Sequence, residues 1–227
     1  MVFYIFLFVL SFLPLTDLFH PGLFKGHDTL LHVARASSFF QSLSEGNLIP
    51  RWGGNLNLGY GHPSLMFYYP APSYLAALLH VVGFSFVDCI KIIFGLGYMT
   101  SIFAMYIWSK EAWGNRAGFI AAILYGFAPY RFVDLYIRGA LGEHLTFLLM
   151  PLILLGLLKH ARDSSFRWLC FTGLFVGVLI LTHNVVSIMF LPILALYALY
   201  LWFFEANRRK SFAIGLFFSL VVVTTQS

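Results

Sequence analysis

The side chains best suited to chemistry begin with an aspartate, a histidine and an arginine at helical spacing. Asp28, His32 and Arg35 stand at i, i+4 and i+7, which places all three on one stripe of an α-helix. A carboxylate can take a proton from a hydroxyl group, and a guanidinium can hold a phosphate through two parallel hydrogen bonds. A plainer interpretation stays open, in which Asp28 caps the helix and the two basic side chains reach toward the membrane surface.

A second group of charged residues lies between positions 131 and 144. Arg131, Asp134 and Arg138 are spaced to share a helix face as an ion-paired stripe. Glu143 follows at the beginning of an apolar run. A carboxylate at a membrane helix is costly and is typically functional, although it also stabilises a helix N-terminus by its charge. Both interpretations of Glu143 stay open.

Three further polar residues complete the candidates. Arg51 lies in the turn-rich sequence Pro50-Arg51-Trp52, and His183 and Asn184 interrupt a long apolar stretch. The His183-Asn184 pair must form a turn between two helices, and it is either only a polar turn or part of a site.

The elements that position these residues belong to a membrane protein. Of the 227 residues, 60% are hydrophobic and 10% are charged, and the mean hydropathy is +0.83. A soluble domain is about 45–50% apolar and about 25% charged, so a soluble fold is excluded. The apolar runs are unbroken rather than alternating, which predicts an all-α bundle and excludes a barrel. We expect residues 1–227 to form a single transmembrane domain without a soluble domain.

The apolar runs predict seven spans, because about 20 helical residues cross the ~30 Å hydrocarbon core. Residues 17–63 form a long first external loop, in which the stripe of Asp28 predicts an amphipathic helix along the membrane surface. Residues 64–86 contain Pro70 and Pro72 and leave too little unbroken helix to span, so they are predicted to be re-entrant or interfacial. The predicted spans are 2–15, 89–108, 117–130, 143–158, 168–182, 185–204 and 211–225.

The basic residues predict the topology. Three short loops, which begin at Lys110, Lys159 and Arg208, hold 8 of the 14 lysines and arginines and should be cytoplasmic. The N-terminus is then inside, and residues 17–63, 130–142 and the turn at 183–184 all face outward. In the alternative topology 64–86 also crosses, and the loop 17–63 shares a side with the basic loops. No basic run exceeds Arg208-Arg209-Lys210, so nucleic acid is not a predicted partner.

Several of these stretches resemble a known class of enzymes. The Asp28, His32 and Arg35 pattern, followed by Gly46 and Pro50-Arg51-Trp52, resembles the first external loop of GT-C membrane glycosyltransferases. Three stretches resemble more closely the bacterial integral membrane proteins grouped as "6-pyruvoyl-tetrahydropterin synthase-related": His62-Pro63 to Tyr69-Pro70-Ala71-Pro72, Tyr136 to Glu143, and Thr182-His183-Asn184. The likeness covers roughly 25–190. Such proteins continue with further helices, so the chain is expected to be an N-terminal fragment, inactive if the missing part is required.

The resemblance implies a reaction and its residues. The donor is a sugar on a polyprenyl phosphate, and transfer takes place at the external face of a bacterial inner membrane. Asp28 is implied as the base, and Glu143 as a second catalytic carboxylate. The substrate ligands are His32, Arg35, Arg51, Arg138, His183 and Asn184, the arginines on the phosphate. No cofactor or metal is predicted, because the further acidic motifs of oligosaccharyltransferases have no match here.

A non-catalytic function is the alternative. A membrane protein or transporter subunit that handles a lipid-linked or anionic substrate should carry ionisable groups at mid-bilayer. The predicted topology instead places nearly every charge at a membrane face, which favours surface chemistry. Membrane lipids and the lipid-linked sugar are the predicted partners, and the sequence does not indicate an oligomeric state.

Overall fold

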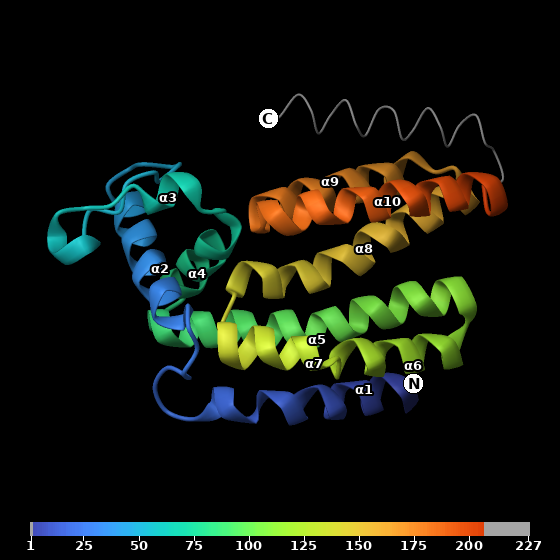
Figure 1. Cartoon of the computed structure of the whole chain (residues 1–227), viewed down its shortest axis with the longest axis horizontal. Coiled ribbons are helices and arrows are strands. Elements are labelled where there is room, and N and C mark those ends of the chain that lie inside the picture. The colour runs from blue at the N-terminus through green and yellow to red at the C-terminus, as the bar shows by residue number, and fades with distance from the viewer. Residues whose placement is uncertain (1, 207–227) are drawn as a thin grey trace.

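The computed structural model describes residues 2–206, and these fold as a bundle of long helices with a cluster of short helices at one end (Figure 1). The long helices run along the longest axis of the molecule and alternate in direction. They are α1 (Val2–Phe12) with its continuation η1 (Leu13–Phe19), α5 (Phe86–Trp113), α6 (Asn115–Gly126), α8 (Leu141–Asp163), α9 (Phe166–Thr182) and α10 (Asn184–Phe204). The all-α prediction is confirmed for the described residues, whose only β feature is one isolated antiparallel bridge between Gly53 and His62.

The prediction of seven spans is wrong. Within residues 2–206, four segments are long and apolar enough to cross a membrane: Val2–Phe19, Phe86–Trp113, Leu141–Asp163 and Asn184–Phe204. A fifth span results if α6 and the segment Pro129–Arg138, which is bent from it by 45°, are counted together. The predicted span 168–182 forms the 17-residue helix α9, which is short for the hydrocarbon core, and the predicted span 211–225 lies outside the described residues.

The bend after α6 has a local cause. Proline lacks the backbone N–H that would continue the helix, and Pro129 follows Gly126 by three residues. The chain restarts there as α7 (Pro129–Phe132) and passes into the π-helical turn η3 (Val133–Arg138), which ends at Gly139. Turns of π-helix are frequent at functional sites, and this one carries Asp134 and Arg138.

The short helices pack together where α1 ends, α8 begins and α9 turns into α10 (Figure 1). They are α2 (Thr29–Ser44), η2 (Asn57–Gly59), α3 (Ser64–Phe67) and α4 (Ala71–Val81). The helix predicted in the first loop is therefore present. On α2 the side of the helix that carries His32 faces the interior of the protein, whereas Leu30 and Leu31 are exposed. The 11 residues of α4 reach only ~16 Å, and the re-entrant or interfacial position of 64–86 stays a prediction.

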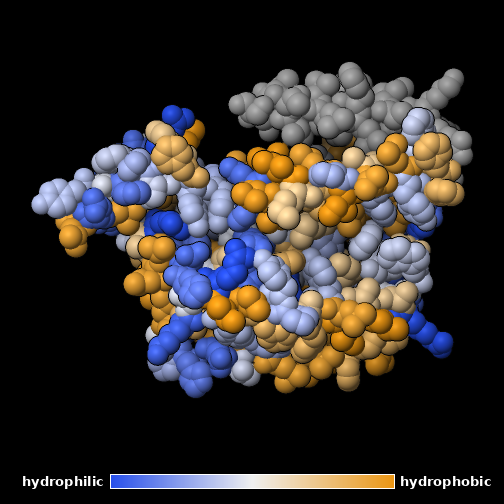
Figure 2. All heavy atoms as spheres, viewed as in Figure 1, coloured by the Kyte–Doolittle hydropathy of each residue, from blue (hydrophilic) through white to orange (hydrophobic). Residues whose placement is uncertain are grey.

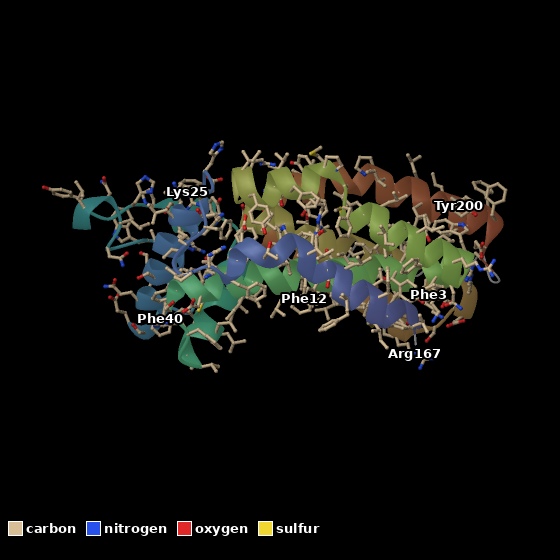
Figure 3. All side chains as sticks on the ribbon, turned by 90° about the horizontal axis from the view of Figure 1, so that it is seen from below. Phe3, Phe12, Lys25, Phe40, Arg167 and Tyr200 are labelled. Atoms are coloured by element: carbon tan, nitrogen blue, oxygen red, sulfur yellow. The ribbon has the colours of Figure 1, made fainter. Side chains whose placement is uncertain are left out.

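The opposite end of the bundle holds two of the three basic loops, and the third lies outside the described residues. The turns from α5 to α6 and from α8 to α9 meet there, and Lys159 Nζ lies 2.7 Å from Glu111 Oε1. In Figure 3, Lys25 and Phe40 lie toward the α2–α4 end, while Arg167 and Tyr200 lie toward the other. Figure 2 shows hydrophobic side chains over the long helices and hydrophilic ones over the α2–α4 end. The bundle thus sorts the loops as the charge pattern requires, and which end is cytoplasmic stays a prediction.

The central helix of the bundle is α5, which packs against α6 on one side and α8 on the other. Its buried face carries Ile90, Phe94, Tyr98 and Ile102, all at most 2% exposed. In a membrane-spanning helix these contacts stabilise the bundle by van der Waals packing, because lipid is as apolar as the side chains themselves. This packed face supports the polar residues of α7, η3 and α8 from beneath.

Candidate functional site

The first loop and the joint between η3 and α8 are joined by backbone hydrogen bonds. The N–H of His27 donates to the carbonyl of Ile137, and the N–H of Asp28 donates to the carbonyl of Arg138, both at 2.9 Å. Gly139 has φ +62°, and a Cβ placed on it would lie 2.5 Å from Thr29 Cγ2. This close approach requires glycine and places Asp28 directly beside the segment that carries Arg138.

Arg138, Glu143 and Tyr130 form the polar cluster at the mouth of α8. Arg138 Nη1 lies 2.6 Å from Glu143 Oε2, and the Tyr130 hydroxyl donates to Glu143 Oε1 at 2.5 Å. The same hydroxyl accepts a hydrogen bond from Arg138. The Arg138 side chain is 42% exposed and that of Glu143 13%. One face of the guanidinium is therefore open to an anion while the other is held in place.

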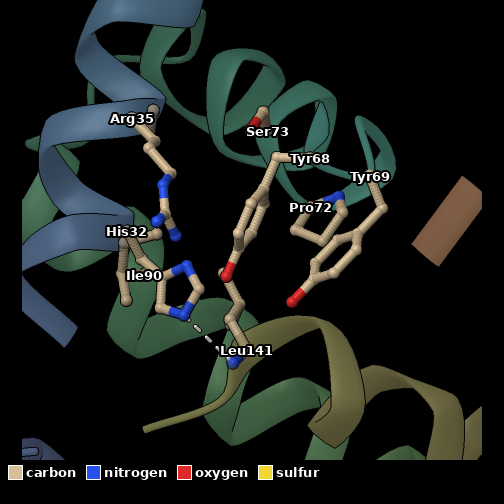
Figure 4. Close-up of a pocket in the computed structure, with 9 residues that line it drawn as sticks. His32, Arg35, Tyr68, Tyr69, Pro72, Ser73, Ile90 and Leu141 are labelled. Carbon is tan, nitrogen blue, oxygen red and sulfur yellow. Dashed lines mark hydrogen bonds between the residues drawn. The ribbon is translucent and has the colours of Figure 1, made fainter. Parts of the chain in front are cut away.

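A pocket lies between α2 and the Tyr68-Tyr69 segment, next to the N-terminus of α8 (Figure 4). The Arg35 guanidinium carbon lies 3.8 Å from the centroid of the Tyr68 ring, a cation–π contact. Arg35 Nη1 is buried and has no hydrogen-bond partner among the described residues. The tyrosine ring thus orients a guanidinium whose donors are not all used.

His32 forms the floor of this pocket as a neutral ring. Its Nε2 accepts a hydrogen bond of 3.3 Å from the backbone N–H of Leu141, the first residue of α8 (Figure 4). Burial, followed by the nearby Arg35 charge, lowers the pKa of His32 to about 4. The side chain is buried, so it does not reach to the membrane surface.

Asp28 occupies the N-cap position of α2, but its side chain makes no capping hydrogen bond. Its charge acts on both His32 and Tyr69. The helix-capping interpretation explains why Asp28 stands at the N-cap position, but its carboxylate does not form the hydrogen bond that a cap would make. The carboxylate lies close enough to His32 and Tyr69, which line the pocket, to act on both electrostatically.

His183 connects the turn between α9 and α10 to the same site. Its Nδ1 accepts from the Val186 N–H at 3.2 Å, which caps α10, and its ring lies 4.8 Å from the Tyr69 ring. Burial lowers the pKa of His183 below its ordinary value, although the nearby Glu143 acts in the opposite direction. The turn is therefore both a structural cap and part of the site.

The structure does not bring every candidate into the pocket. Arg51 lies exposed in the loop before the Gly53–His62 bridge, and Asn184 is exposed at the first turn of α10. Neither contacts Asp28 or Arg138 within the described part of the chain. Their assignment as substrate ligands stays a prediction.

A buried polar layer beneath the cluster was not predicted. Arg131 is 1% exposed and donates to Ser101 Oγ at 2.8 Å, with its guanidinium 4.3 Å from the centroid of the Phe147 ring. Of the expected ion-paired stripe only one contact forms, between Arg138 Nη1 and Asp134 Oδ1 at 3.9 Å. The stripe fails because the bend at Pro129 and the π-helical turn change the spacing, and Arg131 turns into the core.

An apolar groove opens beside the polar cluster, between α4, α8 and α9. It has a volume of about 430 Å³. Its lining includes Leu145 and Thr182, which are sequence neighbours of His144 and His183, and Pro70, which follows Tyr69. Its apolar wall is formed by Leu75, Leu78, Leu148, Leu149, Val178 and Leu181. The groove is therefore apolar throughout its wall, and part of its lining belongs to the same chain segments as the polar site.

The chain resembles known proteins over most of its length. A protein of Lactococcus lactis subsp. cremoris (strain MG1363), itself uncharacterized, is 24% identical over 217 residues. The matched region is 93% of this chain and 35% of that protein, so the chain spans about a third of this relative. No solved structure matches the present chain significantly. Residues 62–226 match the dolichyl-phosphate-mannose-protein mannosyltransferase family. This segment exceeds half of the chain and includes Arg138, Glu143 and His183, so the protein, an integral membrane protein, belongs to that glycosyltransferase family.

Proposed function

We propose that the chain is the membrane part of a glycosyltransferase that moves a sugar from a polyprenyl-phosphate donor to an acceptor hydroxyl. The observation that carries this proposal is the apolar groove between α4, α8 and α9, whose lining residues Leu145 and Thr182 are near in sequence to Glu143 and His183 of the polar site. A polyprenyl phosphate has the matching two parts, a long apolar chain and an anionic head. The family name, which specifies a dolichyl-phosphate-mannose donor, supports the same class of substrate.

The reaction uses groups at the α2–α4 end of the bundle. The Asp28 carboxylate takes the proton of the acceptor hydroxyl, whose oxygen attacks the anomeric carbon of the sugar with inversion. The bond from this carbon to the phosphate oxygen breaks, and its electron pair leaves with the polyprenyl phosphate. Arg138 and Arg35 stabilise the charge that develops on that oxygen, because each has guanidinium donors not used by the protein.

The remaining residues of the site hold these groups in place. Glu143 and Tyr130 restrict Arg138 to one orientation, and neutral His32 holds the N-terminus of α8 next to Asp28. The His183 ring contacts Tyr69, which lines the pocket. A preorganised site of this kind stabilises developing charge without reorienting its dipoles during the reaction.

The orientation in the membrane follows from the basic loops. We assign the end with Lys110 and Lys159 to the cytoplasm, and the α2–α4 end to the external face. The N-terminus is then inside. For a bacterial protein this membrane is the inner, or plasma, membrane.

The test is transfer by the full-length protein in membranes, with a radiolabelled polyprenyl-phosphate sugar and an Asp28→Asn variant. Asparagine caps a helix about as well as aspartate but cannot accept the proton, so transfer should fall about 100-fold with unchanged expression. Asp17→Asn is the matched control, because Asp17 is exposed in η1, outside the site, and this variant should retain activity. Full activity of Asp28→Asn would refute the role of Asp28 as the base.

The same assay separates the catalytic function from the alternative one. Wild-type protein that binds the labelled donor, in competition with polyprenyl phosphate, but never transfers the sugar would favour a non-catalytic lipid-carrier protein. Transfer that depends on Asp28 would exclude it.

A further inference from the structure

The buried pair of Asp134 and His144 is not used by the proposed reaction. Both side chains are fully buried, one on η3 and the other on α8. Asp134 Oδ2 lies 3.4 Å from His144 Nδ1. Neither carboxylate oxygen of Asp134 nor the Nδ1 atom has a conventional hydrogen-bond partner among the described residues. A buried polar group without such a partner requires a physical explanation.

The other ring nitrogen of His144 determines what Nδ1 presents to Asp134. His144 Nε2 lies 3.0 Å from the carbonyl oxygen of Phe94. A carbonyl oxygen can only accept, so Nε2 carries a hydrogen atom, and in a neutral ring Nδ1 carries a lone pair. An ionised Asp134 would then face this lone pair with a negatively charged oxygen. The contact is favourable only if a proton lies between the two atoms.

The position of that proton follows from Arg131. This guanidinium is always charged, is 1% exposed, and acts electrostatically on both Asp134 and His144. A proton on Nδ1 would create a second buried cation beside it. A proton on Asp134 instead leaves a neutral acid that donates to a neutral ring. Burial favours the neutral pair, because each isolated charge loses its hydration.

We propose that Asp134 is a neutral carboxylic acid that donates a hydrogen bond to His144 Nδ1. Because Asp134 then carries no charge, Arg138 forms an ion pair with Glu143 alone, and Asp134 acts as a positioning residue. The consequence for substrate rests on the proposed function. With Asp134 neutral, the cations Arg35, Arg131 and Arg138 outnumber the anions Asp28 and Glu143 by one, and this positive charge attracts a phosphate. An ionised Asp134 would cancel it.

This arrangement makes donor binding depend on pH. The groups that face the pair come from each surrounding element: Tyr98 of α5, Tyr130 and Arg131 of α7, Arg138 of η3, Glu143 of α8, and His183 of the α9–α10 turn. Affinity for an anionic head should be highest while Asp134 is protonated and should fall as rising pH removes its proton. One added negative charge a few ångströms from Arg138 should weaken binding about tenfold.

Infrared spectroscopy of the full-length protein in detergent tests the proton directly and does not depend on activity. At about pH 7 an unperturbed aspartate is ionised. The wild type should nevertheless show the C=O band of a protonated carboxyl group, absent from Asp134→Asn and retained in Asp17→Asn. If Asp134→Asn does not fold, wild-type protein labelled with carbon-13 in aspartate should show the band and lose it at high pH. A spectrum without a protonated aspartate would overturn the proposal.

Binding of undecaprenyl phosphate to the same two variants tests the charge effect. Wild type and Asp17→Asn should bind it less tightly as the pH rises above neutrality, whereas Asp134→Asn should stay within about threefold of its neutral-pH affinity. An equal pH dependence in all three proteins would refute the charge effect. No binding by any of them, with the infrared band present, would refute the proposed donor and leave the proton assignment standing.

Discussion

Replacing Arg138 with glutamine should separate catalysis from stability, because this guanidinium is held from one side and open on the other. The substitution removes the ion pair with Glu143 at 2.6 Å and the hydrogen bond to Tyr130. It does not change the backbone carbonyl of residue 138, which accepts a hydrogen bond from the N–H of Asp28. We therefore expect the fold to survive and the transfer reaction to fail.

The two magnitudes follow from the exposure of the side chain. At 42% exposure the ion pair is screened by solvent, so its loss should lower the free energy of unfolding by about 0.5–1 kcal/mol. Removing a charged donor from the leaving phosphate oxygen should lower the transfer rate about 100-fold to 1,000-fold, on the scale of an oxyanion-hole donor. Arg138→Lys keeps the positive charge but lacks the planar guanidinium. Its transfer rate should lie between those of the wild type and Arg138→Gln.

The assay is sugar transfer by the full-length protein, measured together with thermal unfolding of the same preparations. Arg167→Gln is the matched control, because Arg167 is exposed at the opposite end of the bundle and should change neither quantity (Figure 3). A loss of transfer below about tenfold in a folded Arg138→Gln protein would refute contact between Arg138 and the phosphate. A loss of transfer that follows a large loss of stability would show that the role of Arg138 is structural.

Two further predictions concern the elements that hold the site together. The pKa of His32 is lowered to about 4 in the folded protein, so stability should be fully present above the unfolded value of 6.5 and be lost as the pH falls toward 4. The loss should reach about 3 kcal/mol at most, and pH-dependent unfolding of His32→Gln should lack it. Gly139→Ala should destabilise the protein by about 1–3 kcal/mol, because alanine is strained at positive φ and its Cβ meets Thr29. Chemical denaturation measures this change, and a variant as stable as the wild type would show that the contact can relax.

The membrane character of this protein and its candidate residues could be predicted from composition and spacing. Unbroken apolar runs require helices, because backbone groups in lipid can be paired only within a helix or a closed barrel. The i, i+4, i+7 spacing of Asp28, His32 and Arg35 predicted a helix with these residues on one side, and α2 contains it. The basic loops predicted which turns share an end. These properties depend on local periodicity and on the sum of charges, and both can be read along the chain.

The number of spans and the depth of the charged residues were decided by tertiary structure. Hydropathy does not show the 45° bend that Pro129 causes, and the π-helical turn into which the chain continues depends on what packs against it. Arg131 was predicted to share an ion-paired stripe with Asp134 and Arg138, yet three aromatic rings from α5, α6 and α8 enclose its guanidinium. Likewise, Asp134 and His144 meet only because η3 folds back onto α8. Contacts between elements distant in sequence have no signature in periodicity, so only the packed bundle determines which ionisable groups are buried together.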